Sequence, residues 1–132
     1  MKKIGLIIAD ESEYVMIREK ADKLGAVRHD FFTREGHRFN LDENTEVYTV
    51  LCGVGMVNAA AAATYFATLK LDAILSFGLS GGISGIRRGE FSVGTEYIEH
   101  DFDLTPLGYK PCEKPLQNYV YKGDKKIISL FT

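Results

Sequence analysis

A short apolar run near the N-terminus, followed at once by a helical pattern, limits the possible folds more than any other feature. Residues 3–9 read Lys-Ile-Gly-Leu-Ile-Ile-Ala and lack the polar alternation of a half-exposed strand. Such a run is typical of a strand that is covered on both faces. Residues 10–24 then place apolar side chains at helical spacing, and Gly25 is a natural helix end. A strand that leads directly into a helix predicts an α/β protein.

The rest of the chain continues to alternate between strand-like and helix-like segments. We expect a hairpin within residues 26–41, strands at 46–52, 73–77 and 91–104, and helices at 56–69 and 124–131. This order predicts one α/β domain over residues 1–132, with a mixed central sheet flanked by helices. The last helix has an apolar face and no strand after it, so we expect the sheet to be incomplete at its C-terminal end.

Composition excludes several classes of partner. The formal charge is −2, from 16 basic and 18 acidic residues, so a basic face for nucleic acid is not expected. Cys52 and Cys112 form no Cys-x-x-Cys pair, which argues against a disulfide framework or a zinc site. No apolar run reaches the roughly 18 residues that a membrane span needs. We therefore expect a cytoplasmic protein without metal or cofactor, and without a nucleic-acid or membrane partner.

The first glycine-rich turn, residues 53–58, lies between a predicted strand and an alanine-rich helix. Its sequence Gly-Val-Gly-Met-Val-Asn is close to the dinucleotide-binding fingerprint, but Asn58 stands where the third glycine belongs. The acid that should bind the ribose is also misplaced, because Asp72 precedes the next strand instead of ending it. A tight strand-to-helix turn is therefore favoured over a dinucleotide site.

The second glycine-rich segment, residues 78–85, has four glycines in eight residues and follows a short buried strand. Glycine is needed where φ is positive or where a ligand touches the backbone. The carboxyl ends of strands are where α/β sheets bind ligands, so free N–H groups here could hold a sugar or a carboxylate. A wide turn without a ligand explains the composition equally well.

An acidic turn, Asp10-Glu11-Ser12-Glu13, begins the first predicted helix. Asp10 and Glu13 have the spacing of a capping box, and acids favour a helix N-terminus. A carboxylate here could also serve as a general base for water at the ligand-binding edge. The spacing alone favours the cap. Either way, the acids would repel phosphate, which prefers Arg or Lys.

One segment that is expected to be extended carries His100, Asp101 and Asp103 close together. In a strand His100 would face away from both aspartates, which opposes a metal site. We therefore expect the aspartates to anchor the loop that follows. The other histidines, His29 and His37, lie on the predicted hairpin and are expected to be ordinary surface residues.

Four segments in this order resemble the N-terminal half of the 5′-methylthioadenosine/S-adenosylhomocysteine nucleosidases, which belong to the nucleoside phosphorylase/hydrolase superfamily. The match spans nearly the whole chain but a little over half of a typical family member. The matching segments are residues 3–9 with the acids that follow, residues 53–60, residues 77–82, and residues 100–105 with Gly108-Tyr109.

The resemblance implies a nucleoside phosphorylase-like fold and a hydrolase that cleaves the N-glycosidic bond of adenine thionucleosides in methionine salvage. Glu13 occupies the position that activates the attacking water. An oxocarbenium-like ribosyl cation is expected when adenine leaves, with water deprotonated on the opposite face. The resemblance further implies a homodimer, in which part of each subunit completes its neighbour's 5′-alkylthio pocket. The implied substrate contacts are Val54, Leu79, Ser80 and Gly81, and, lent to the neighbouring subunit, Leu104, Leu107, Tyr109 and Pro115.

The chain departs from the family at two site positions and in its extent. Leu79 replaces a serine, and Asp10 replaces a methionine. The family's purine-recognition segment, ribose-binding glutamates and aspartate acid lie in the half that has no counterpart here. Three alternatives stay open: a nucleoside phosphorylase using Arg87 and Arg88, a non-catalytic nucleoside-binding protein, and one half of a split enzyme that needs a complementing C-terminal half.

Overall fold

The computed structural model describes residues 1–131, which form two compact units. The first unit is Met1–Gly81, and the second begins at Gly82. Among the described residues, no helix is both long enough and apolar enough to cross a membrane. The single domain expected over residues 1–132 stays a prediction, so the units are described separately.

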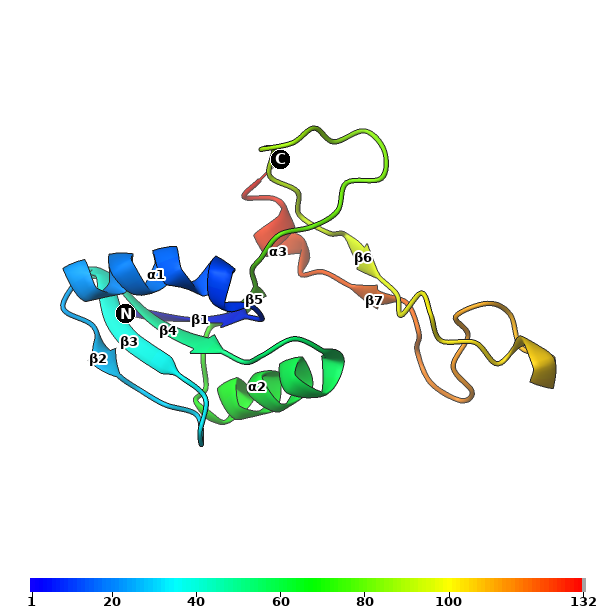
Figure 1. The fold of residues 1–132 in the computed structure, drawn as a ribbon, viewed down its shortest axis with the longest axis horizontal. Coiled ribbons are helices and arrows are strands. Elements are labelled where there is room, and N and C mark those ends of the chain that lie inside the picture. Colours follow the sequence, from blue (N-terminus) through cyan, green and yellow to red (C-terminus); the bar gives the residue numbers. More distant parts are fainter. Residues whose placement is uncertain (132) are drawn as a thin grey trace. The chain divides into compact units, whose positions relative to one another are not determined.

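The first unit is built on a mixed sheet in which β1 is an interior strand (Figure 1). β1 pairs in parallel with β4 on one side and β5 on the other, whereas β3 runs antiparallel to β4. This confirms the expected mixed sheet flanked by helices. The strands are β1 (Lys2–Ile8), β2 (Val27–Arg28), β3 (Gly36–Asp42), β4 (Thr45–Leu51) and β5 (Ala73–Ser76), in the order β2-β3-β4-β1-β5.

Two helices cover opposite faces of this sheet, α1 (Glu11–Lys23) above it and α2 (Met56–Thr68) below it in Figure 1. On the α2 face, Phe66 packs in a buried cluster with Val50 and neighbouring side chains. On the α1 face, Ala21 packs against Phe39 and Val47. Because both faces are covered, β1 carries apolar side chains on both faces after its first two residues, which explains the missing alternation in residues 3–9.

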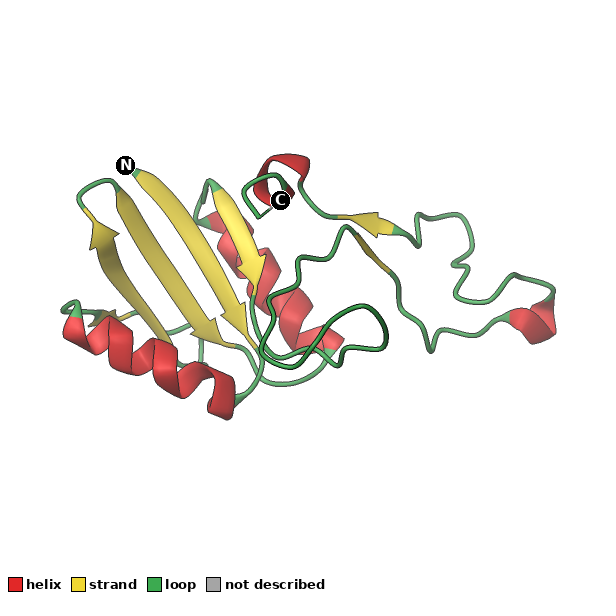
Figure 2. Ribbon diagram, turned by 90° about the horizontal axis from the view of Figure 1, so that it is seen from above, coloured by secondary structure: helices red, strands yellow, loops and turns green. Residues whose placement is uncertain are grey.

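The topology brings three loops to one edge of the sheet. β1, β4 and β5 run in the same direction, so their carboxyl ends lie together (Figure 2). The chain leaves β1 for α1 and returns to β4, then crosses through α2 to β5 on the far side of β1. The strand order therefore changes direction at β1, and such a switch point is where α/β sheets bind ligands.

The second unit has little regular structure. Its strands β6 (Glu96–Tyr97) and β7 (Tyr121–Lys122) form an antiparallel pair, with the short 3-10 helix η1 (Thr105–Leu107) between them and the helix α3 (Lys125–Ile128) after them. The long strand expected over residues 91–104 is therefore wrong, because only two residues of that segment pair with a partner strand. The last helix is also shorter than expected.

The segment with His100 and Asp101 forms a turn and not a strand, so the alternation argument used for it does not apply. The expected anchoring role of the aspartates is seen at Asp103. Its Oδ1 accepts a hydrogen bond from the backbone N–H of Thr105 at 2.8 Å, at the start of η1. Hydrogen bonding from the side chain of Thr105, and then from its backbone N–H, lowers the pKa of Asp103.

Gly36 is the position in the first unit where an added methyl group should be least tolerated. A Cβ at Gly36 would touch the backbone carbonyl oxygen of His29 and would lie 2.8 Å from that of Thr49. The backbone of β4 and of the segment that follows β2 cannot move aside cheaply, so we expect Gly36→Ala to lower the free energy of unfolding by about 3 kcal/mol. Urea unfolding measures this, with Gly81→Ala as the control because a Cβ there meets nothing within 4 Å. Equal unfolding midpoints for the two variants would contradict the prediction.

Candidate functional site

The carboxylate of Glu13 is held at the carboxyl edge of the sheet by the loop after β5. The backbone N–H of Leu79 donates a hydrogen bond to Glu13 Oε1 at 2.7 Å, across 66 positions of sequence. Glu13 is in the first turn of α1, directly after β1, and is half-buried. The acidic turn and the second glycine-rich segment are therefore one site and not two.

Gly78 allows this close approach. A Cβ at residue 78 would lie 2.8 Å from both carboxylate oxygens of Glu13, closer than such atoms can pack. The glycine is thus required because the carboxylate lies against the backbone. Because the donor is the N–H of Leu79 and not its side chain, the contact does not depend on the serine that the nucleosidase family has at this position.

The N-terminus of α1 is capped without help from Glu13. Asp10 is the cap residue, and its Oδ1 accepts a hydrogen bond from the backbone N–H of Ser12 at 2.9 Å. Hydrogen bonds from Ser12 lower the pKa of Asp10, so this carboxylate is charged near neutral pH. The cap expected from the spacing is present, but the Glu13 carboxylate is directed to Leu79 and stays available for another role.

A buried hydrogen-bonded cluster anchors α1 directly behind Glu13. The hydroxyl of Tyr14, which is fully buried, lies 2.8 Å from His37 Nδ1 and 2.8 Å from Thr49 Oγ1. Burial raises the pKa of Tyr14. The cluster joins the first turn of α1 to β3 and β4, and so fixes the helix that presents Glu13.

Both hairpin histidines are more buried than expected, so their assignment as ordinary surface residues is wrong. His37 is 8% exposed, because alternation along β3 places it with Phe39 on the face that α1 covers. His29 is half-buried, and its Nε2 lies 2.8 Å from the hydroxyl of Tyr65 on α2. The signal that could have found His37 is this alternation with Phe39.

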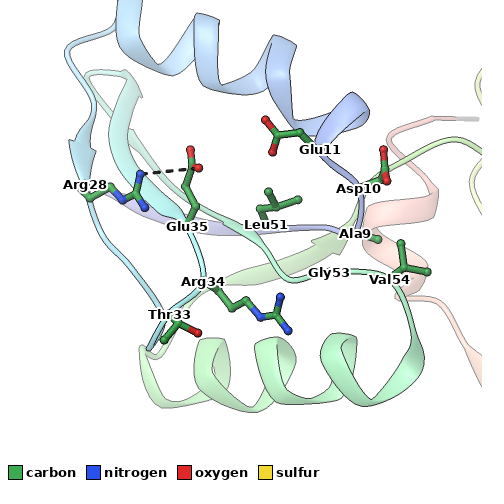
Figure 3. Close-up of a pocket in the computed structure, with 10 residues that line it drawn as sticks. All are labelled: Ala9, Asp10, Glu11, Arg28, Thr33, Arg34, Glu35, Leu51, Gly53 and Val54. Atoms are coloured by element: carbon green, nitrogen blue, oxygen red, sulfur yellow. Dashed lines mark ion pairs between the residues drawn. The ribbon is translucent and has the colours of Figure 1, made fainter.

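An open cavity of about 480 Å³ lies along the same edge of the sheet (Figure 3). It extends from the ends of β1 and β4 to the turn between β2 and β3. Figure 3 shows the acidic residues of the α1 turn on one side and the side chain of Arg34 on the other. The lining residues are Ala9, Asp10, Glu11, Arg28, Thr33, Arg34, Glu35, Leu51, Gly53 and Val54.

The residues singled out from the sequence are divided between the two units. Val54 lines the cavity and is 72% exposed, and Leu79 is 87% exposed beside Glu13. Ser80 and Gly81 follow Leu79 and are exposed as well. The residues implied for the neighbouring subunit's pocket, Leu104, Leu107, Tyr109 and Pro115, all belong to the second unit.

The first glycine-rich turn has the geometry of a tight turn. Gly53 and Gly55 have φ values of 89° and 108°, which residues with a side chain rarely adopt. Asp72 is at the amino end of β5, where its Oδ2 accepts a hydrogen bond from the backbone N–H of Lys3 at 2.7 Å. It is therefore at the opposite edge from the turn, as the sequence indicated, and cannot serve as the acid of a dinucleotide fingerprint.

Arg34 is the cavity residue that sequence reasoning missed, because nothing distinguished it from the other residues of the hairpin expected within residues 26–41. Its Nη2 donates a hydrogen bond to Asn58 Oδ1 at 3.0 Å. The Asn58 side chain in turn donates to the carbonyl oxygen of Val54 at 2.8 Å. The departure from the fingerprint at Asn58 was the available signal, since this side chain links the two turns.

Comparison with known proteins places the chain in a family. The sequence matches the phosphorylase superfamily over residues 3–131. A curated 5′-methylthioadenosine/S-adenosylhomocysteine nucleosidase of Maridesulfovibrio salexigens is 34% identical over 130 residues, which are 97% of this chain and 55% of that protein. One from an Exiguobacterium species is 30% identical over 131 residues, 97% of this chain and 54% of the relative.

Solved structures show the same similarity to nucleosidases. A Neisseria meningitidis nucleosidase of the same name, in complex with methylthio-immucillin-A, is 26% identical with a TM-score of 0.83, over 98% of this chain and 55% of that one. A Francisella philomiragia protein at 24% identity shares the fold, with a TM-score of 0.87 over 98% of this chain and 56% of its own. The resemblance to these nucleosidases is thus confirmed, although the chain spans about 55% of the length of the relatives it matches. The chain belongs to the phosphorylase superfamily.

Proposed function

We propose that this protein hydrolyses the N-glycosidic bond of adenine thionucleosides, 5′-methylthioadenosine and S-adenosylhomocysteine, with Glu13 as the base that activates water. The observation that carries the proposal is the Glu13 carboxylate fixed against the Gly78 bend, with Leu79 N–H on Oε1 at 2.7 Å. The names of the curated relatives support the substrate class.

The fixed carboxylate suits the chemistry. One oxygen of Glu13 is occupied by the Leu79 N–H, which orients the group and leaves the other oxygen to accept a proton. In the proposed reaction the C1′–N9 bond breaks and its electron pair leaves with adenine. Water attacks the oxocarbenium-like C1′ and gives its proton to Glu13. The acid that protonates adenine belongs, in this proposal, to the part of the relatives that this chain does not match.

The residues of the second unit extend the proposal to a second copy of the chain. Leu107 is 72% exposed and Tyr109 is 37% exposed. Apolar residues that pack against a neighbouring subunit are exposed in this way when one subunit is considered alone. We propose that these two, with Leu104 and Pro115, complete the 5′-alkylthio pocket of a partner in a homodimer.

Water is favoured over phosphate as the nucleophile because of the charges around the site. Asp10, Glu11 and Glu13 all lie in the turn after β1, and carboxylates repel a phosphate ion. Arg87, considered above for phosphate, forms an ion pair with Glu90 at 3.0 Å. The carboxylates of this turn make hydrolysis the better fit at Glu13.

Product analysis tests the proposal. We expect the chain, completed by a C-terminal half that supplies the acid and given 5′-methylthioadenosine in a buffer without phosphate, to release adenine and the free thiosugar at a rate that added phosphate does not raise. Chromatography with a phosphate series measures both products. Formation of a sugar 1-phosphate would show phosphorolysis instead. Calorimetric binding of the nucleoside without any adenine release would favour a non-catalytic binding protein.

A further inference from the structure

We infer that Arg34 makes the cavity beside the site a receptor for a carboxylate on the 5′ substituent of the nucleoside, so that the protein prefers S-adenosylhomocysteine to 5′-methylthioadenosine. The inference rests on the proposed function and assigns a specificity role to a residue outside the water-activating centre. The two nucleosides share adenine, ribose and sulfur. Only S-adenosylhomocysteine has an amino acid with a carboxylate on that sulfur.

The ion pairs of the cavity single out Arg34, which lies on the side opposite to Asp10 and Glu11 (Figure 3). Glu11 and Glu35 both pair with Arg18, at 2.8 Å and 2.6 Å. Arg28, which also lines the cavity, lies 3.8 Å from Glu35 and contacts Asp30. Within residues 1–131, Arg34 is the only arginine of the cavity lining without a carboxylate in ion-pair range.

The Arg34 guanidinium is held in place before any ligand arrives. Asn58 accepts one of its hydrogen bonds at 3.0 Å, and Asn58 is fixed by the carbonyl of Val54 at 2.8 Å. A Cβ on Gly53 would lie only 3.1 Å from Arg34 Nη1, so the glycine gives the guanidinium its room. Its remaining N–H groups stay available, and an oriented guanidinium is the side chain best suited to bind a carboxylate through two parallel hydrogen bonds.

The position of the cavity suits a 5′ substituent. Val54, which we propose contacts the nucleoside, also lines the cavity and supports Asn58. A nucleoside with its ribose at Glu13 could extend its 5′ chain past Val54 toward Arg34 along the sheet edge. The cavity, at about 480 Å³, has room for an aminobutyrate chain. A methylthio group has no carboxylate to accept hydrogen bonds from the guanidinium, so Arg34 would recognise the side chain of one substrate and not that of the other.

The test compares the dissociation constants of the two nucleosides, measured by calorimetry with the purified protein and with variants. We expect S-adenosylhomocysteine to bind more tightly. In Arg34→Gln, the ratio of the two dissociation constants should move about tenfold toward equal affinity. Arg28→Gln is the matched control. It makes the same charge change in the same cavity, at an arginine that is already paired with carboxylates. This variant should shift the ratio of the two dissociation constants less than twofold. Higher salt should also reduce the preference, because an open ion pair is screened.

A second variant keeps the test decisive if Arg34→Gln unfolds. Asn58→Ala retains the guanidinium charge but removes its support, and should lose part of the same preference. An unchanged ratio in the variants, or equal affinity of the unmodified protein for both nucleosides, would overturn the inference and leave the proposed function intact. Binding of neither nucleoside would overturn the proposed function, and the inference with it. Phosphate-dependent binding that Arg34→Gln abolishes would show that the guanidinium holds phosphate and not a substrate carboxylate.

Discussion

Replacing Glu13 by glutamine is expected to lower kcat/KM for adenine release by about 10³-fold, the typical contribution of a general base. The glutamine oxygen can still accept the hydrogen bond from Leu79 N–H, which spans 2.7 Å in the unmodified protein, so the loop should keep its position. What is lost is the ability to take a proton from water. The loss should therefore appear mainly in kcat, with KM changed much less. Steady-state kinetics with 5′-methylthioadenosine measure both constants.

The control for this variant is Glu19→Gln, on the same helix. Glu19 is exposed and has no ion pair among the described residues, so the same chemical change there should leave kcat/KM within twofold. Thermal unfolding of both variants should match that of the unmodified protein within a few degrees. Retention of more than a tenth of the activity in Glu13→Gln would show that another group activates the water, and would remove Glu13 from the proposed mechanism.

Gly78→Ala is expected to separate activity from stability. The new methyl group would lie 2.8 Å from both oxygens of Glu13 and would push the carboxylate out of place. Moving the end of a flexible side chain destabilises the fold little, whereas a displacement of about 1 Å at a catalytic group can lower the rate by about 10²-fold. We therefore expect a large loss in kcat/KM with an almost unchanged unfolding temperature.

A double variant identifies the route of this effect. If Gly78→Ala acts by displacing Glu13, it should reduce activity little further in a protein that already carries Glu13→Gln, so the two losses should be far from additive. Additive losses would mean that the methyl group disturbs something other than the carboxylate. A loss of unfolding free energy as large as that expected for Gly36→Ala would instead indicate a general packing defect.

The first unit could be predicted from the sequence because its signals are local. The apolar run of β1 and the alanine-rich α2 each identify their element without reference to the rest of the chain. The second unit lacks such signals. The pairing of Glu96–Tyr97 with Tyr121–Lys122 joins residues far apart in sequence, and two-residue strands carry no periodicity to detect.

The candidate site could be predicted only in part, for a related reason. The spacing of Asp10 and Glu13 indicated a capping box, and only the folded sheet shows that Leu79 receives the Glu13 carboxylate. His37 and Arg34 were missed because each acquires its role from a side chain on another element, Tyr14 for the first and Asn58 for the second. Sequence patterns report neighbours along the chain, whereas these contacts depend on strand order.

The interior place of β1, between β4 and β5, has a consequence for synthesis on the ribosome. This strand emerges well before its partners, since Lys2 pairs with Thr45 and Ile4 with Ala73. Until β5 is translated, a nascent chain holds an apolar strand with an unsatisfied edge, and such edges attract other chains. We expect the growing polypeptide to depend on chaperone protection up to that point, and the Glu13 contact to form only after the loop beyond Ser76 has left the exit tunnel.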